Sequence, residues 1–110
     1  MRRFRRKVFY VFVFSENSET RRQIINRYKN GEIYIPGISS YETRIRSKKS
    51  LEELKREIRV AVRFYVLVDA TMPEAEKRCL HDALCDVCEN ETVSLKAINL
   101  NRQENAFCGF

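Results

Sequence analysis

The chain has 110 residues, of which 44% are hydrophobic and 33% charged, which is the length and composition of one globular domain and excludes disordered and collagen-like proteins. With 3 glycines and 2 prolines it lacks the glycine-rich phosphate loops of P-loop and dinucleotide-binding proteins. The net charge of +6 favours a polyanionic partner, and we expect a single basic α/β domain over 1–110 with a basic leader at 1–7 and a tail at 101–110.

The first predicted element is a strand over 8–14, an uninterrupted run of β-branched and aromatic residues. Such a run is typical of a central strand that is covered on both faces. The basic leader and this run together imitate a signal peptide. However, the run is too short to span a bilayer, and residues 15–19 offer no small-residue cleavage site. We therefore expect a cytoplasmic protein without a membrane partner.

A first helix is predicted from the capping-box spacing at 20–23 to a stop at Gly31. A strand at 32–35, a turn at Pro36-Gly37 and an alternating strand around 41–46 then predict a β-hairpin with one charged face. A second capping box begins at Ser50, and its helix is expected to give way to a strand at about 61–68.

The clearest helix start is Thr71-Met72-Pro73-Glu74, with Thr71 as the cap and Pro73 in the first turn. This helix is expected to reach about Asn90, followed by a strand at 92–100 and an apolar segment at 106–110 that docks onto the body. The order βαββαβ followed by αβ predicts an α+β fold. It matches a ferredoxin-like plait with a C-terminal αβ extension and a mixed, mainly antiparallel sheet.

Positive charge is concentrated in the first part of the chain. Residues 1–63 hold 17 basic and 7 acidic side chains, a net charge of +10, whereas 64–110 hold 4 and 8, a net charge of −4. Arginine grips phosphate through two hydrogen bonds, and neutralising several phosphates releases counterions. The predicted nucleic-acid-binding residues are Arg2, Arg3, Arg5, Arg6, Lys7, Arg21, Arg22, Arg44, Arg46, Lys48 and Lys49, with Tyr34 and Tyr41 as stacking partners for bases.

Cysteine and histidine gather between 79 and 88. On a helix His81, Cys85 and Cys88 fall within about 60° of one another, while Cys79 lies about 160° from His81. With Cys108 from the tail they are candidate ligands of a Cys3His zinc site. Three ligands from one straight helix are unusual in such sites, so the alternative is a helix with packed, reduced thiols and no cofactor.

We interpret the chain as a small basic, non-catalytic protein that binds nucleic acid, with RNA among the candidates. It does not carry the aromatic-glycine signature of the RNA-binding plait. One alternative is a protein-interaction module, such as an accessory or inhibitor protein of a phage or mobile element, which would engage an acidic surface of a larger partner. A homodimer is also compatible with the sequence.

The second alternative is a small nuclease. Glu16 and Asp69 each follow a predicted strand, and clustered carboxylates hold the metal ions of such enzymes. Acidic residues after strands are also ordinary loop residues. The sequence identifies no catalytic residue, and we expect binding without catalysis.

Overall fold

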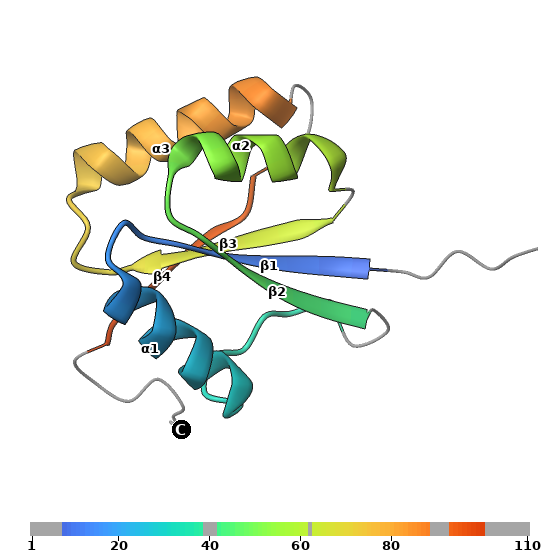
Figure 1. The fold of residues 1–110 in the computed structure, drawn as a ribbon, viewed down its shortest axis with the longest axis vertical. Helices are drawn as coiled ribbons and strands as arrows, with labels where there is room; N and C mark the ends of the chain where they lie inside the picture. The colour runs from blue at the N-terminus through green and yellow to red at the C-terminus, as the bar shows by residue number, and fades with distance from the viewer. Residues whose placement is uncertain (1–7, 39–41, 62, 89–92, 101–110) are drawn as a thin grey trace, which may run out of the picture.

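The computed structural model describes residues 8–38, 42–61, 63–88 and 93–100. Within them strands and helices alternate along the chain: β1 (Val8–Phe14), α1 (Ser18–Lys29), β2 (Glu42–Lys48), α2 (Leu51–Val60), β3 (Phe64–Asp69), α3 (Glu74–Cys88) and β4 (Leu95–Ile98). The described strands form one sheet in the order β2-β1-β3-β4, and each neighbouring pair is parallel. Helices α2 and α3 cover one face of the sheet and α1 covers the other (Figure 1).

The central strand β1 has an apolar core on each side. Phe12 and Phe14 pack into the cluster under α2 and α3, whereas Val11 and Val13 pack into the cluster under α1. All four are buried. This two-sided burial explains why the strand carries no polar position, and it confirms the predicted central strand at 8–14.

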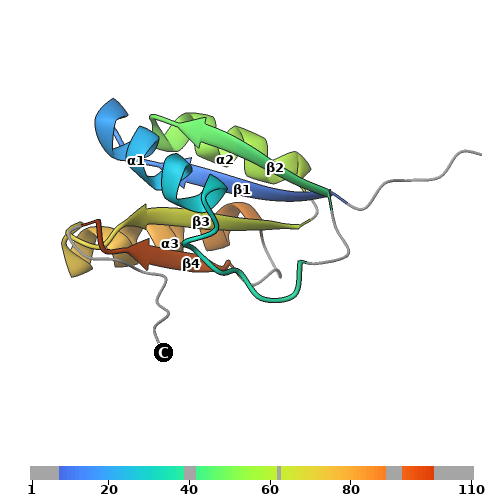
Figure 2. The same ribbon diagram turned by 90° about the horizontal axis from the view of Figure 1, so that it is seen from below.

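The predicted ferredoxin-like plait with a mainly antiparallel sheet is wrong. Residues 32–38 form no strand, and β2 pairs with β1 in parallel, so no hairpin exists at Pro36-Gly37. Ile33 and Ile35, whose spacing suggested a strand, are buried because this connection packs on the α1 side of the sheet (Figure 2). Parallel neighbours require a connection that crosses the sheet, which α1 and this segment provide.

The helix starts follow local side-chain chemistry. Ser50 caps α2 as predicted, because its hydroxyl accepts a hydrogen bond from the Glu53 amide at 3.2 Å. Helix α1 begins earlier than its predicted capping box, because the Asn17 side chain accepts from the Thr20 amide at 2.9 Å. Thr71 does not cap α3; its hydroxyl bonds to the Asp69 carboxylate at 2.9 Å.

The later strands are shorter than expected. Helix α2 continues to Val60, so β3 begins at Phe64 and not at about 61. Strand β4 covers Leu95–Ile98 of the predicted 92–100, while the end of the third predicted helix at Asn90 and the tail from 101 lie outside the described residues. Among the described helices, none has both the length and the apolar composition needed to cross a bilayer.

The two-layered core can be tested at Leu67, which lies in β3 and is 0% exposed. Replacing it with Ala leaves a cavity and is expected to lower the free energy of unfolding by about 2–5 kcal/mol in chemical denaturation. The matched variant Val60→Ala removes an aliphatic side chain that is 80% exposed and should change stability by less than about 0.5 kcal/mol. Similar small effects for both variants would contradict the placement of Leu67.

Candidate nucleic-acid interface

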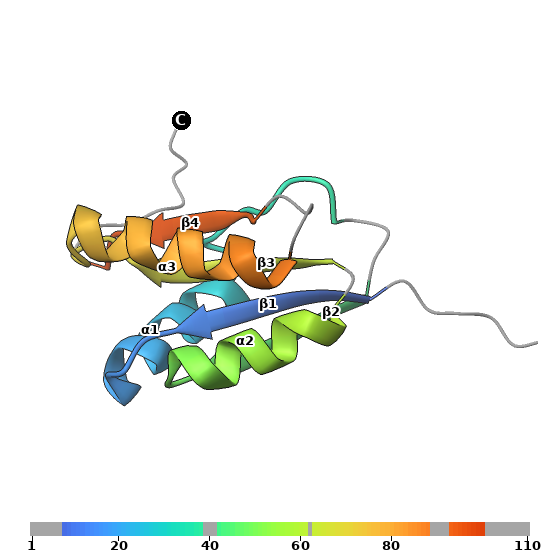
Figure 3. The ribbon, with the colours of Figure 1, turned by 90° about the horizontal axis from the view of Figure 1, so that it is seen from above.

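Three of the predicted binding residues lie in a row along β2, which is an edge strand of the described sheet. Arg44, Arg46 and Lys48 lie beside β1 residues that pack under α2 and α3, among them Tyr10 and Phe12. Paired residues of neighbouring strands share a face, so the three cations lie on the same side of the sheet as α2. Figure 3 shows α2 lying over this side of the sheet. Alternate residues of a strand recur about every 6.6 Å. We call these three residues the β2 row.

Arg46 is the exposed centre of the β2 row. Its guanidinium lies over the Tyr10 ring, 5.9 Å from the ring centre, and donates a hydrogen bond to the Ile45 carbonyl oxygen at 3.1 Å. The Tyr10 ring is itself stacked on Phe12 with 5.6 Å between ring centres. A guanidinium that rests on an aromatic face keeps its fork of N–H donors available to an anion.

Carboxylates flank the other two cations of the β2 row. The Nε atom of Arg44 lies 3.4 Å from a carboxylate oxygen of Glu42, and Lys48 Nζ lies 3.5 Å from one of Glu57. The Arg44–Glu42 pair is partly exposed and contributes less than about 1 kcal/mol, so a phosphate can compete for Arg44. Lys48 is more enclosed, with 14% of its side chain exposed. Lys49, the next residue in the chain, is exposed.

The basic leader joins the domain close to the β2 row. Val8 pairs with Glu42, two residues before Arg44, and Lys7 directly precedes Val8 in the chain. The leader cations lie outside the described residues, as does Tyr41. The structure places only the attachment point of the leader, at Val8, beside the β2 row.

The remaining predicted binding residues lie on the other face. Helix α1 carries Arg21, which donates a hydrogen bond to the Ser15 carbonyl oxygen, and Arg22, which donates to both carboxylate oxygens of Glu19. Tyr34 follows α1 and is 77% exposed. The structure therefore does not bring these three residues together with the β2 row.

Tyr10 is the aromatic neighbour of the β2 row, and it was not among the predicted binding residues. In the sequence it appears as one apolar position of a central strand. Its contact with Arg46 depends on the parallel register between β1 and β2, which no local pattern encodes. The regular placement of Arg44 and Arg46 on one side of their strand was the available signal.

The predicted zinc ligands are brought together in part. Cys85 Sγ lies 3.7 Å from His81 Nδ1 and 3.8 Å from His81 Nε2, whereas Cys79 is exposed and Cys88 packs at the core. Cys108 lies outside the described residues. Within 8–38, 42–61, 63–88 and 93–100, no three His, Cys, Asp or Glu residues are grouped to hold a metal ion. The four-ligand zinc site stays a prediction.

The carboxylates of the nuclease hypothesis share one crevice at the carboxyl ends of β1 and β3. This crevice, of about 310 Å³, is lined by Glu16, Asp69 and Glu76 together with polar loop residues. The connection after β1 leads outward to β2 and the connection after β3 leads outward to β4 on the other side, and ligands of open α/β sheets bind at such positions. Asp69 is engaged by Thr71, whose amide and hydroxyl both donate to it, at 3.1 and 2.9 Å.

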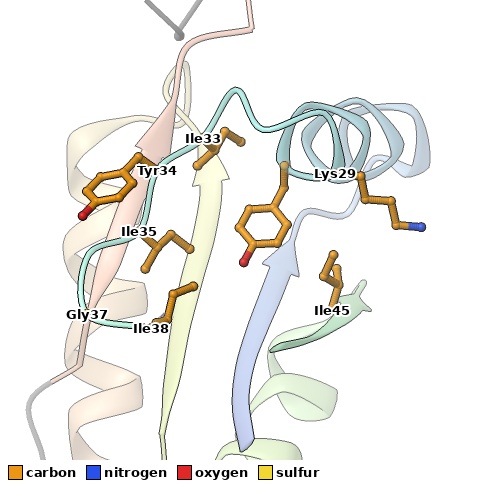
Figure 4. A pocket seen from close by; sticks show the side chains of 8 residues that line it. Lys29, Ile33, Tyr34, Ile35, Gly37, Ile38 and Ile45 are labelled. Carbon is orange, nitrogen blue, oxygen red and sulfur yellow. The ribbon is translucent and has the colours of Figure 1, made fainter. Parts of the chain in front are cut away.

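An apolar groove of about 500 Å³ lies on the α1 side, between α1, the segment at 33–38 and β2. Ile35, Ile38 and Ile45 project into the space between these elements, while the ammonium group of Lys29 points away from it (Figure 4). Tyr34 lines the rim. The groove is open and carries few polar groups.

The contact between Arg22 and Glu19 affects the titration of the Glu19 carboxyl group. The hydrogen bond from Arg22 lowers the pKa of Glu19 below its ordinary value. Because that pKa is lower in the folded chain than in the unfolded chain, the stabilisation is present above the unfolded pKa and is lost as pH falls through the folded pKa. Arg22→Ala should raise the pKa of Glu19 in an NMR titration of side-chain carboxyls, and an unchanged titration would contradict the contact.

No protein-family model, no curated protein and no solved structure matches the chain.

Proposed function

We propose that the protein binds nucleic acid, without catalysis, through the β2 row and the adjoining basic leader. The observation that carries this proposal is the register between Val8 and Glu42, which joins the leader to the amino end of the β2 row. Together the leader and the row hold eight of the chain's 21 basic side chains. Such a density of cations at one edge supports binding of a polyanion.

The chemistry of the β2 row favours contact with phosphates over reading of bases. Arginine matches the geometry of a phosphate with two parallel hydrogen bonds, and cations at alternate strand positions can follow a chain of phosphates. The face of the Tyr10 ring is already used by Arg46, so stacking on a base is not required. We therefore expect affinity with little sequence preference and a strong dependence on salt.

The double variant Arg44→Ala, Arg46→Ala tests the surface. In fluorescence anisotropy with a labelled single-stranded oligonucleotide, the logarithm of the binding constant should fall linearly with the logarithm of the salt concentration. The variant should bind more weakly and reduce the slope by about 1.4, because each lost phosphate contact contributes about 0.7 for a single strand.

The matched control is Arg22→Ala, Lys29→Ala, which removes the same charge from α1 on the other face. This control should leave the salt slope close to that of the wild type. Equal weakening by both double variants would show an effect of net charge alone and would contradict the β2 row as the interface. No retention on heparin and no anisotropy change even at low salt would refute the proposed function.

Removal of a competing carboxylate should have the opposite effect. Glu42→Gln frees Arg44 from its ion pair and adds one net positive charge beside the leader. A few-fold gain in affinity at low salt is expected, and the gain should shrink as salt screens the charges. Glu19→Gln makes the same charge change on α1, so an equal gain there would contradict a local effect at Glu42.

The apolar groove on the α1 side favours a second candidate, a protein-interaction module. An open groove of about 500 Å³ beside an exposed tyrosine resembles the anchor pockets of protein interfaces. If the protein does not bind nucleic acid, the protein-interaction function becomes the first candidate.

The crevice shared by Glu16 and Asp69 supports the nuclease alternative. A nuclease would cleave a labelled nucleic-acid strand, and the variant Asp69→Asn would abolish this cleavage.

A further inference from the structure

Helix α3 places a histidine and a cysteine at the spacing of two ligands of one metal ion. His81 and Cys85 are one helical turn apart, and Cys85 Sγ lies 3.7 and 3.8 Å from the two ring nitrogens of His81. In a tetrahedral zinc site, bond lengths of about 2.3 Å to sulfur and about 2.0–2.1 Å to nitrogen separate two such ligands by about 3.5 Å. The sulfur is almost equally distant from the two ring nitrogens, so the His81 ring must turn to direct Nε2 at an ion shared with Cys85.

A carboxylate lies beside one nitrogen of the same histidine. His81 Nδ1 is 3.7 Å from a carboxylate oxygen of Asp82. A histidine that binds a metal commonly has its other ring nitrogen oriented by a carboxylate. Here that arrangement leaves Nε2 for the ion. The His81 side chain is 44% exposed, so an ion can reach it from solvent.

The pair supplies two of the four ligands that structural zinc requires. No third ligand is grouped with them among the described residues. Cys85 packs partly against the apolar cluster under α2 and α3, and His81 lines a hollow with Val93 and Leu95. The adjoining positions Arg78, Asp82 and Asp86 are exposed, so a second helix can approach the pair from this neighbouring side of α3. When two identical helices meet antiparallel about a two-fold axis centred between His81 and Cys85, the histidine of each copy lies opposite the cysteine of the other.

We propose that α3 carries half of a zinc site and that a second copy of the chain completes it as a Cys2His2 centre. The metal displaces the thiol proton of each Cys85, so two thiolates and two neutral imidazoles hold the ion. Asp82 acts as the positioning residue for His81. The proposed zinc site lies on α3 and shares no residue with the β2 row, so it does not depend on nucleic-acid binding.

Titration of the full chain, freed of metal by a chelator, with Co²⁺ and Zn²⁺ tests the site. Tetrahedral Co²⁺ with thiolate ligands produces a charge-transfer absorption, and this signal should saturate at about half an ion per chain. Sedimentation velocity should show a monomer that becomes a dimer as Zn²⁺ is added. His81→Ala and Cys85→Ser should abolish both signals, and Asp82→Asn should weaken Co²⁺ binding by about 10-fold or more.

Cys79→Ser is the matched control, because Cys79 is an exposed cysteine of the same helix on another face. It should retain the Co²⁺ signal and the dimer, while circular dichroism verifies that each variant folds. Absence of a metal-dependent dimer in the wild type would overturn the proposal. One ion per monomer, or loss of binding in Cys88→Ser or Cys108→Ser, would overturn completion by a second copy, because the further ligands would then come from the same chain.

Discussion

The parallel pairing of β1 with a neighbour on each side is the constraint on which the rest of the structure depends. Parallel strands cannot be joined by a tight hairpin, so α1 must cross one face of the sheet to reach β2 and α2 must cross the other to reach β3. Both faces of β1 are then covered, which requires apolar side chains at successive positions. The crevice at the carboxyl ends of β1 and β3 lies between the segments that lead into α1 on one face and into α3 on the other.

The crossings also determine which charged helix ends lie at each edge of the sheet. Each helix that links parallel strands runs back against them, so the helix N-termini gather at the carboxyl edge of the sheet and the C-termini at the amino edge. Acidic side chains stabilise the first turn of a helix and basic ones the last. The first turns hold Glu19, Glu52, Glu53, Glu74 and Glu76, and the last turns of α1 and α2 hold Arg27, Lys29 and Arg59. The first turns therefore place these carboxylates at the carboxyl edge of the sheet, where Lys48 also lies, and β1 begins after the leader at the opposite edge.

Local signals in the sequence predicted the elements better than their assembly. The apolar run of β1 and the Ser50 cap depend on neighbouring residues, and the structure confirms both. The hairpin prediction failed because alternation at 41–46 is equally compatible with a parallel edge strand, and the buried Ile33 and Ile35 imitate a strand. The spacing of four residues on one helix brings His81 and Cys85 into contact, as predicted.

Features that depend on register could not be predicted. The contact of Arg46 with Tyr10 and the attachment of the leader beside Glu42 both follow from how β1 pairs with β2, which is a nonlocal choice. Glu16 and Asp69 were identified because each follows a predicted strand. Their shared crevice depends on the parallel pairing of β1 with β3, because the carboxyl ends of antiparallel neighbours lie at opposite edges of a sheet. Spacing within one helix is fixed by geometry, whereas spacing between strands is fixed by the whole core.

Arg27 of α1 also contacts the chain directly after β4, on the far side of the sheet order. Its guanidinium donates hydrogen bonds to the carbonyl oxygens of Asn99 and Leu100, at 3.2 and 2.7 Å, immediately after the short strand β4. A strand of four residues forms few backbone hydrogen bonds with its neighbour, so the Arg27 side chain helps to hold β4 at the edge of the sheet. Detachment of β4 would uncover the N–H and C=O groups of β3 that pair with it, and another polypeptide could add a strand there. The two hydrogen bonds of Arg27 thus help to keep this edge closed to foreign strands.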